Sequence, residues 1–235
     1  MRVLVVYNFE GCRLGQIGTA LSEADARIDL VRAHLGEPLP KGPEGHDAIV
    51  VLGGVQNALA DDTSPWLPRL LDVMRGFAES GRSLLGVCLG SQLLARAYGG
   101  ANIIGGASEF GWQRVDLTPE GVDDPLFTGT APSFPIFQWH DDTFEMPSAA
   151  TRLATGHSVE NQAFVIGRAA YGIQFHFEAD RPLVAEWNGE YADLLARLQP
   201  GWAKRHPAEA DRFGPASDAV GLAIARNWVR TIGKS

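Results

Sequence analysis

Residues 83–94 read SLLGVCLGSQLL and join two kinds of local structure. The apolar run before Cys88 is short and unbroken, which is typical of a buried parallel strand, and the apolar residues after Gly90 recur at helical spacing. Cys88 has Gly86 two positions before it and Gly90 two positions after it. This is the G-x-S-x-G pattern of a nucleophile elbow, with sulfur in place of the hydroxyl. It predicts strained backbone at Cys88 and close packing of strand on helix, which requires small flanking residues.

The segments around this elbow alternate between short apolar runs and amphipathic stretches. Strands are predicted at 2–7, 28–31, 48–52, 112–117, 134–139, 151–155, 162–167 and 171–175. Helices are predicted at 14–23, 66–79, 183–198 and 216–232. The alternation predicts an α/β fold, a doubly wound and mostly parallel sheet flanked by helices, with an antiparallel extension after residue 102. We expect a single domain over 1–235, since no linker or repeat interrupts the pattern.

Composition narrows the class of protein. The chain has 235 residues, 45% of them hydrophobic and 20% charged, as is ordinary for a soluble globular protein. The net charge of −8, without a basic block, argues against nucleic acid or an anionic membrane as partner. No apolar run approaches the ~20 residues of a membrane span. The two cysteines make no disulfide framework, and the N-terminus has no signal-peptide pattern, so we expect a cytoplasmic protein.

A second motif, GIQFHFE at residues 172–178, supplies what a cysteine nucleophile needs. Such a thiol requires a base, and the base requires an orienting group. His176 follows the predicted strand, and Glu178 stands two residues later. In an extended segment residues i and i+2 point the same way, so we expect Glu178 to reach the imidazole. The pattern predicts a Cys88–His176–Glu178 triad for acyl transfer.

Together, GVCLGSQ at 86–92 and GIQFHFE at 172–178 resemble the class I, or triad, glutamine amidotransferases. The resemblance implies a flavodoxin-like fold, Cys88 as nucleophile, and no cofactor or metal. It also implies that LGG at 52–54 forms the oxyanion turn, with the Gly54 and Leu89 amides as donors. The segment QWHDD at 138–142 resembles the GMP synthetase amidotransferase branch. From these matches we expect four substrate-binding residues: Gln92, Trp139, His140 and Asp142.

The sequence departs from the family pattern at three positions. Phe177 stands where proline is usual, Trp139 where serine is common, and Asp141 where glycine is common. These departures leave the triad intact and alter the substrate pocket.

The resemblance implies hydrolysis of the γ-amide of glutamine through a glutamyl thioester. Ammonia would pass to an acceptor or to a synthetase partner in trans, because the 235 residues hold no ATP-grasp or phosphate-loop segment. One alternative is a stand-alone γ-glutamyl hydrolase or peptidase that acts on another γ-glutamyl amide, which the altered pocket residues favour. The second alternative is a non-catalytic binding relative, against which the intact triad argues.

Two other features are interpreted as structural. Cys12 lies in a glycine-flanked loop and is expected to be a buried thiol. His140 with Asp141 and Asp142 could be a metal cluster, but no second histidine stands nearby at ligand spacing, so no metal is predicted.

Overall fold

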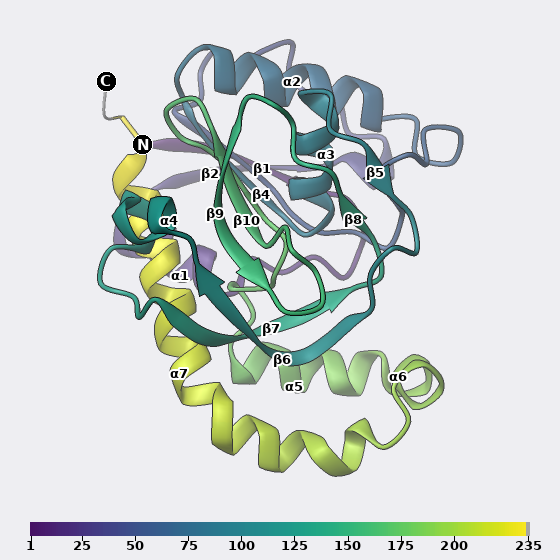
Figure 1. Ribbon diagram of the computed structural model, residues 1–235. Helices are drawn as coiled ribbons and strands as arrows, with labels where there is room; N and C mark the ends of the chain where they lie inside the picture. The colour runs from purple at the N-terminus through teal and green to yellow at the C-terminus, as the bar shows by residue number, and fades with distance from the viewer. Residues whose placement is uncertain (234–235) are drawn as a thin grey trace.

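A nine-stranded sheet forms the centre of the computed structural model, which describes residues 1–233 (Figure 1). Its strands lie in the order β2-β1-β3-β4-β11-β10-β9-β6-β7. The first five are parallel: β2 (Arg27–Arg32), β1 (Arg2–Tyr7), β3 (Ala48–Val51), β4 (Ser83–Val87) and β11 (Ala170–Ile173). The other four pair antiparallel: β10 (Ala163–Ile166), β9 (Ala150–Gly156), β6 (Glu109–Leu117) and β7 (Ser133–His140). The predicted fold class is therefore confirmed. A separate pair joins β5 (Asn102–Ile103) to β8 (Thr143–Phe144).

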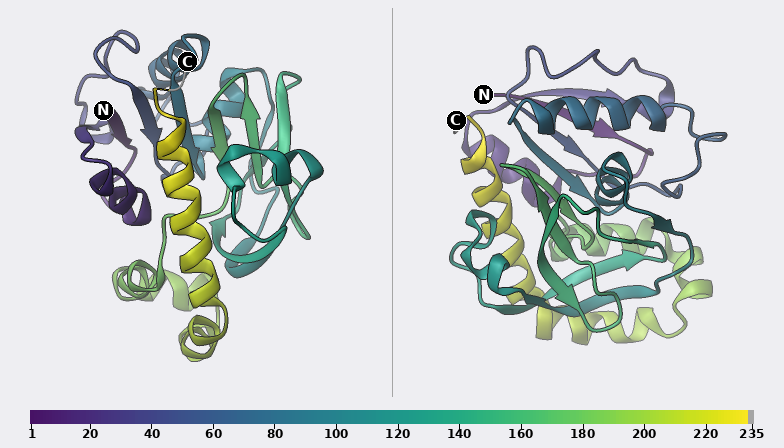
Figure 2. Two further views of the ribbon diagram at one scale, coloured as in Figure 1. Left: turned by 90° about the vertical axis from the view of Figure 1, so that its left-hand side faces the viewer. Right: turned by 45° about the horizontal axis from the view of Figure 1, so that its top comes forward.

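Helices cover both faces of the sheet, as the side view in Figure 2 shows for α7. They are α1 (Gly15–Glu23), α2 (Leu67–Glu79), α3 (Leu89–Ala97), α4 (Pro119–Asp123), α5 (Arg181–Glu190), α6 (Ala192–Leu198) and α7 (Trp202–Thr231), with 3₁₀ turns η1 (Ala33–Leu35) and η2 (Pro125–Phe127). Along β1, Val3 and Val5 pack in the core under α1 and α7, while Leu4 and Val6 pack under α2 and α3. Because both faces are covered, β1 is apolar at every inner position.

The C-terminal helices differ from the prediction. The helix expected over 183–198 is two helices, α5 and α6, which break at Tyr191, where φ is −110° and ψ 24°. The break lets Trp187 of α5 and Leu195 of α6 pack into one aromatic cluster with Trp202. The Trp202 indole also donates to the Asn188 side chain at 2.7 Å. The packing of α5 and α6 around Trp202 therefore favours two short helices over the single long helix that the local sequence predicts.

Helix α7 begins at Trp202, whereas the sequence predicted a start at residue 216. Proline removes a backbone donor and normally ends or bends a helix. The structure keeps both Pro207 and Pro215 inside α7, and Figure 1 shows the helix changing direction between its lower and upper parts. Neither α7 nor any other helix within residues 1–233 has the length and apolarity needed to cross a membrane.

The parallel half of the sheet sets the position of the site. Its strand order corresponds to the flavodoxin-like order 2-1-3-4-5, in which ligands bind outside the carboxyl ends of the strands. Asn8, Gly53 and Cys88 come within two residues of the ends of β1, β3 and β4, and Gln174 follows β11 directly. These neighbouring ends bring together segments that are far apart in the sequence.

Candidate active site

The elbow between β4 and α3 has the predicted strained backbone. Cys88 has φ 52° and ψ −110°, a conformation that L residues rarely adopt. A Cβ added to Gly86 would lie 2.4 Å from the Gly90 carbonyl oxygen, and one added to Gly90 would lie 2.1 Å from that of Val51. The Cys88 amide donates to the Ile173 carbonyl at 2.8 Å, which ties the elbow to β11. The need for both flanking glycines is confirmed.

His176 and Glu178 make the predicted contact through a different backbone geometry. The His176 Nδ1 and the Glu178 Oε1 are 2.7 Å apart, and both side chains are buried. The expectation of an extended segment is wrong, because β11 ends at Ile173 and the chain turns, with the Ala179 amide donating to the His176 carbonyl at 3.3 Å. The turn brings the carboxylate to the imidazole.

Two helices hold the turn that carries Glu178. At the start of α1, the Gln16 amide donates to the Glu178 carbonyl at 2.9 Å, and the Gln16 side chain donates to the Phe177 carbonyl at 3.1 Å. Gly15 and Gly221 pack directly on these carbonyls, since an added Cβ would lie 2.0 Å from the Glu178 oxygen and 2.2 Å from the Phe177 oxygen, respectively. Phe177, at the usual proline position, is fully buried in the core under α1 and α7.

The electrostatics of the pair favour a charged imidazole. Burial alone would lower the pKa of His176, but the Glu178 carboxylate and a hydrogen bond with Cys88 outweigh it and raise that pKa well above its ordinary value. The raised pKa favours the imidazolium, which is lost as the pH rises through the raised value. A group that favours a donatable proton thus shares the cavity with the Cys88 thiol.

The turn after β3 lies against these groups. A Cβ added to Gly53 would lie 3.5 Å from both the Cys88 Cβ and the His176 Cε1. The amides of Gly54 and Leu89 donate to no protein acceptor within the described residues 1–233, and both residues line the same pocket. Two free backbone donors beside a nucleophile are what an oxyanion hole requires.

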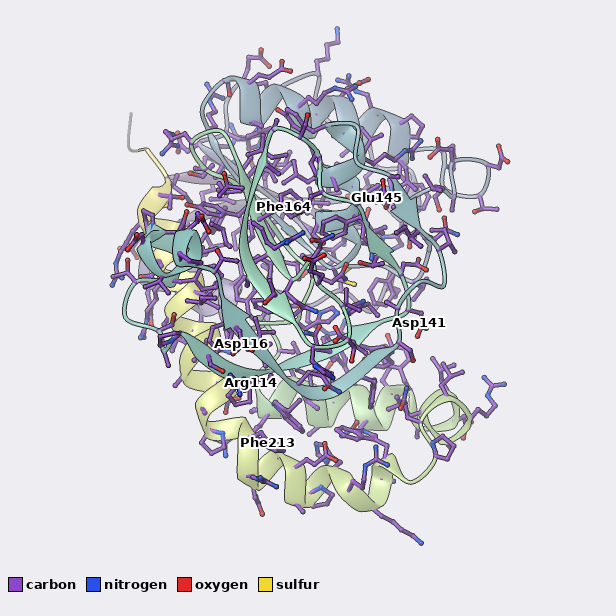
Figure 3. All side chains as sticks on the ribbon, viewed as in Figure 1. Arg114, Asp116, Asp141, Glu145, Phe164 and Phe213 are labelled. Carbon is purple, nitrogen blue, oxygen red and sulfur yellow. The ribbon has the colours of Figure 1, made fainter. Side chains whose placement is uncertain are left out.

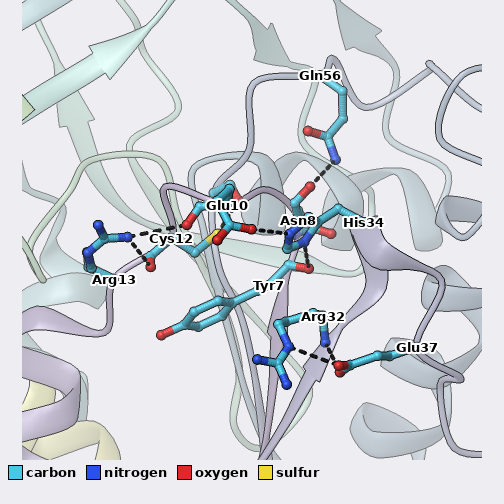
Figure 4. Close-up of polar contacts among 10 residues, drawn as sticks. Tyr7, Asn8, Glu10, Cys12, Arg13, Arg32, His34, Glu37 and Gln56 are labelled. Carbon is cyan, nitrogen blue, oxygen red and sulfur yellow. Dashed lines mark hydrogen bonds and ion pairs between the residues drawn. The ribbon is translucent and has the colours of Figure 1, made fainter. Parts of the chain in front are cut away.

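Cys12 contacts this turn, which its position in the sequence did not indicate. Its thiol is 3.5 Å from the Gly53 carbonyl oxygen, which it can reach as a donor. Burial raises the pKa of Cys12 to about 11, with small opposing effects from backbone hydrogen bonds, so it stays a neutral thiol. In a trans peptide C=O and N–H point in opposite directions, so the Gly54 N–H points away from Cys12. Figure 4 shows Cys12 in the loop after β1, beside Arg13.

A cavity of about 290 Å³ lies between these segments. Its lining residues include the following: Cys12, Gly54, Cys88, Leu89, His176 and Glu178. Of the residues predicted to bind substrate, Gln92 and His140 are buried and already hydrogen-bonded within the protein. Gln92 Nε2 donates to the Asp142 carbonyl at 3.3 Å and to Gln174 Oε1 at 3.2 Å. The ring nitrogens of His140 face the Asp142 carbonyl and Glu109 Oε2, each at 3.0 Å. Both side chains therefore support the loop at Asp142, and Gln174 and Glu109 join the network without having been predicted.

The remaining predicted residues, Trp139 and Asp142, line the same cavity. The Trp139 carbonyl is 3.9 Å from the Cys88 sulfur, and its indole ring faces α5 and α6. Asp142 Oδ1 accepts from the Gly105 amide at 2.8 Å, so one carboxylate oxygen holds the loop. Asp141 is exposed beside the end of β7, where Figure 3 labels it.

Cys88, His176 and Glu178 thus share one cavity at the carboxyl ends of the parallel strands of a flavodoxin-like sheet. The chain belongs to the class I glutamine amidotransferase family, whose model matches residues 6–182. The predicted family is therefore confirmed.

Three curated relatives describe the range of this family. A glutamine amidotransferase-like protein of Salmonella typhimurium, YfeJ, is 29% identical over 64% of this chain and 64% of its own length. Gamma-glutamyl peptidase 5 of Arabidopsis thaliana is 28% identical over 72% of this chain and 68% of its own. A glutamine-hydrolysing GMP synthase subunit of Methanothermobacter thermautotrophicus is 30% identical over 61% of this chain and 70% of its own. The chain thus spans about two thirds of each relative.

A solved structure extends the likeness over the whole chain. The crystal structure of a glutamine amidotransferase from Thermotoga maritima superimposes with a TM-score of 0.84 and 28% identity. The match covers 99% of this chain and 98% of that one, so it includes the helices that follow residue 182.

Proposed function

We propose that this protein is a cysteine-dependent amidohydrolase that cleaves γ-glutamyl amides, of which glutamine is the simplest. One observation carries the proposal: a strained Cys88 shares a pocket with the hydrogen-bonded pair of His176 and Glu178. That arrangement provides the nucleophile, the acid–base group and its orienting carboxylate. It also argues against a non-catalytic relative.

In the first half-reaction the Cys88 thiolate attacks the γ-carbonyl carbon of the substrate. The electron pair of the C=O bond moves to oxygen, where the amides of Gly54 and Leu89 stabilise the negative charge. The His176 imidazolium then donates its Nε2 proton to the amide nitrogen, the C–N bond breaks, and ammonia or an amine leaves. A glutamyl thioester on Cys88 remains.

In the second half-reaction water replaces the amine. The now neutral His176 takes a proton from water, whose oxygen attacks the thioester carbonyl. The same two amides stabilise the second tetrahedral intermediate, which collapses with cleavage of the C–S bond. Glutamate and the Cys88 thiolate–imidazolium pair are regenerated. Glu178 keeps the imidazole in orientation throughout through the contact at Nδ1.

The test is an assay of the purified chain alone with glutamine and simple γ-glutamyl amides. We expect stoichiometric release of glutamate and of the corresponding amine. If a correctly folded protein cleaves none of these amides, the proposal is wrong.

A second candidate role is that of a glutaminase that supplies ammonia to a synthetase in trans. The similarity to the GMP synthase subunit of Methanothermobacter thermautotrophicus favours it. In that case glutamine turnover by the chain alone should be slow. Fast turnover without a partner would contradict strict dependence on a synthetase.

Replacing Glu178 by glutamine should shift the pH dependence of the reaction. The carboxylate raises the pKa of His176, so without it the imidazolium is lost at a lower pH. We expect the basic limb of kcat/KM to move to lower pH and its maximum to fall by roughly 10²–10⁴. The matched control is Glu160→Gln. Glu160 is exposed, lies between β9 and β10, and forms an ion pair with Arg152 of β9. A basic limb that stays unchanged in Glu178→Gln would contradict the role given to this carboxylate.

A further inference from the structure

An aromatic wall extends the pocket beyond His176. Trp187 packs edge-on against the His176 ring, with centroids 5.4 Å apart and an interplanar angle of 82°. Trp139 contacts Trp187 at 5.7 Å and Tyr191 at 5.5 Å, both edge-to-face. Leu194 and Leu198 of α6 line the same cavity. The wall, defined as Trp139, Trp187, Tyr191, Leu194 and Leu198, makes this end of the pocket apolar.

Most of this wall lies outside the segment that the family model matches. The family match ends at residue 182, while Trp187, Tyr191, Leu194 and Leu198 come from α5, α6 and the break between them. The groups proposed to break the amide bond all lie before residue 182. The wall thus shares the cavity with the proposed reacting groups but comes mostly from a different segment, so its role is in the choice of substrate.

The chemistry fixes which part of the substrate faces the wall. The leaving nitrogen must receive its proton from His176, so the leaving group lies on the imidazole side of the scissile bond. Trp187 contacts that imidazole and lines the same cavity. We expect the glutamyl end to face the loop at Asp142, around which the predicted substrate-binding residues Gln92 and His140 lie. A substituent on the leaving amine would thus extend along the aromatic wall. Glutamine, which releases ammonia, has no such substituent and would make no contact with the wall.

Two ionisable side chains beside the wall, Arg13 and Tyr191, carry no unpaired charge. Arg13 at the mouth forms ion pairs with Glu186 at 3.0 Å and Glu190 at 3.7 Å. Burial and the neighbouring Glu190 raise the pKa of Tyr191 to about 12, so its phenol is neutral. Nothing in these contacts selects a charged substituent.

We propose that the preferred substrates are γ-glutamyl amides of apolar amines, with an aromatic or branched alkyl group on the leaving nitrogen. This inference rests on the proposed function and names the substrate class of the same site. Burial of one aromatic ring against such a wall is enough to raise kcat/KM by about 10- to 100-fold over a substrate that lacks it.

The test compares three probes with the purified chain: glutamine, γ-glutamylmethylamide and γ-glutamylbenzylamide. We expect kcat/KM for the benzylamide to exceed that for the methylamide by about 10- to 100-fold. Cleavage of glutamine and the methylamide without an advantage for the benzylamide overturns this inference and leaves the proposed function standing. Cleavage of no probe overturns both.

Two variants link the preference to the wall. Leu194→Ser removes apolar surface from half-buried Leu194, so the ratio of benzylamide to methylamide should fall at least severalfold. Leu35→Ser is the matched control, because Leu35 is 63% exposed on η1 and does not line the cavity; its ratio should match the wild type. Thermal melting confirms that both variants are folded. An unchanged ratio in folded Leu194→Ser would also overturn the inference.

Discussion

Replacing Cys88 by serine is expected to lower kcat/KM for γ-glutamyl amides by at least ~10³, and by up to ~10⁶. The hydroxyl fits the space of the thiol, but serine needs a far stronger base to become a nucleophile. The His176–Glu178 pair is arranged as an imidazolium that donates a proton, which suits a thiolate partner. The measurement is glutamate release at saturating and limiting substrate.

The chain offers a matched control in its other cysteine. Cys12 is buried in the same pocket, and its thiol reaches the Gly53 carbonyl. In Cys12→Ser a hydroxyl can donate to the same oxygen, so we expect a loss smaller than about 10-fold. A large loss in Cys12→Ser together with retained activity in Cys88→Ser would reverse the assignment of the nucleophile.

Replacing Gly90 by alanine is expected to destabilise the protein by roughly 3 kcal/mol or more. The new Cβ would lie 2.1 Å from the Val51 carbonyl oxygen, a backbone atom in the centre of the sheet. Neither β3 nor α3 can move without disturbing buried neighbours on both sides. The measurement is the free energy of unfolding from denaturant titration.

Gly189→Ala is the contrasting control for this prediction. Gly189 lies within α5, and an added Cβ would meet no atom within 4 Å. Alanine has the higher helix propensity, so this variant should be stabilised by about 0.5–1 kcal/mol. Equal stability of the two variants would contradict the close packing inferred at the elbow.

The parallel half of the fold was predictable because its signals are local. Short apolar runs such as 48–52 are buried on both faces, and glycine at positions 86 and 90 reports the close approach of strand and helix. The pairing of His176 with Glu178 was also predicted, although an extended segment was assumed. The turn depends on contacts from Gln16 and Gly221, which are distant in the sequence.

Other features depend on tertiary contacts that no local pattern reveals. The predicted helix began only at residue 216, yet α7 begins at Trp202 and continues through Pro215, with Trp202 and Trp228 both buried along its length. Cys12 reaches the turn at Gly53 only because β1 and β3 are neighbours in the sheet. The network that holds the loop at Asp142 likewise joins residues from four separate segments.

Covalent labelling tests the central claim most directly. A glutamine analogue with a diazoketone in place of the carboxamide presents its diazo carbon to the nucleophile. The diazo carbon first gains a proton from His176 and becomes electrophilic; the thiolate then forms an S–C bond to it as the C–N bond breaks and dinitrogen leaves. Peptide mapping by mass spectrometry then identifies the modified residue. We predict one label per chain, on Cys88. Activity should fall in proportion to the fraction of chains labelled, and γ-glutamyl amides should slow the labelling. Labelling at Cys12 instead, or full activity with Cys88 labelled, would contradict the account.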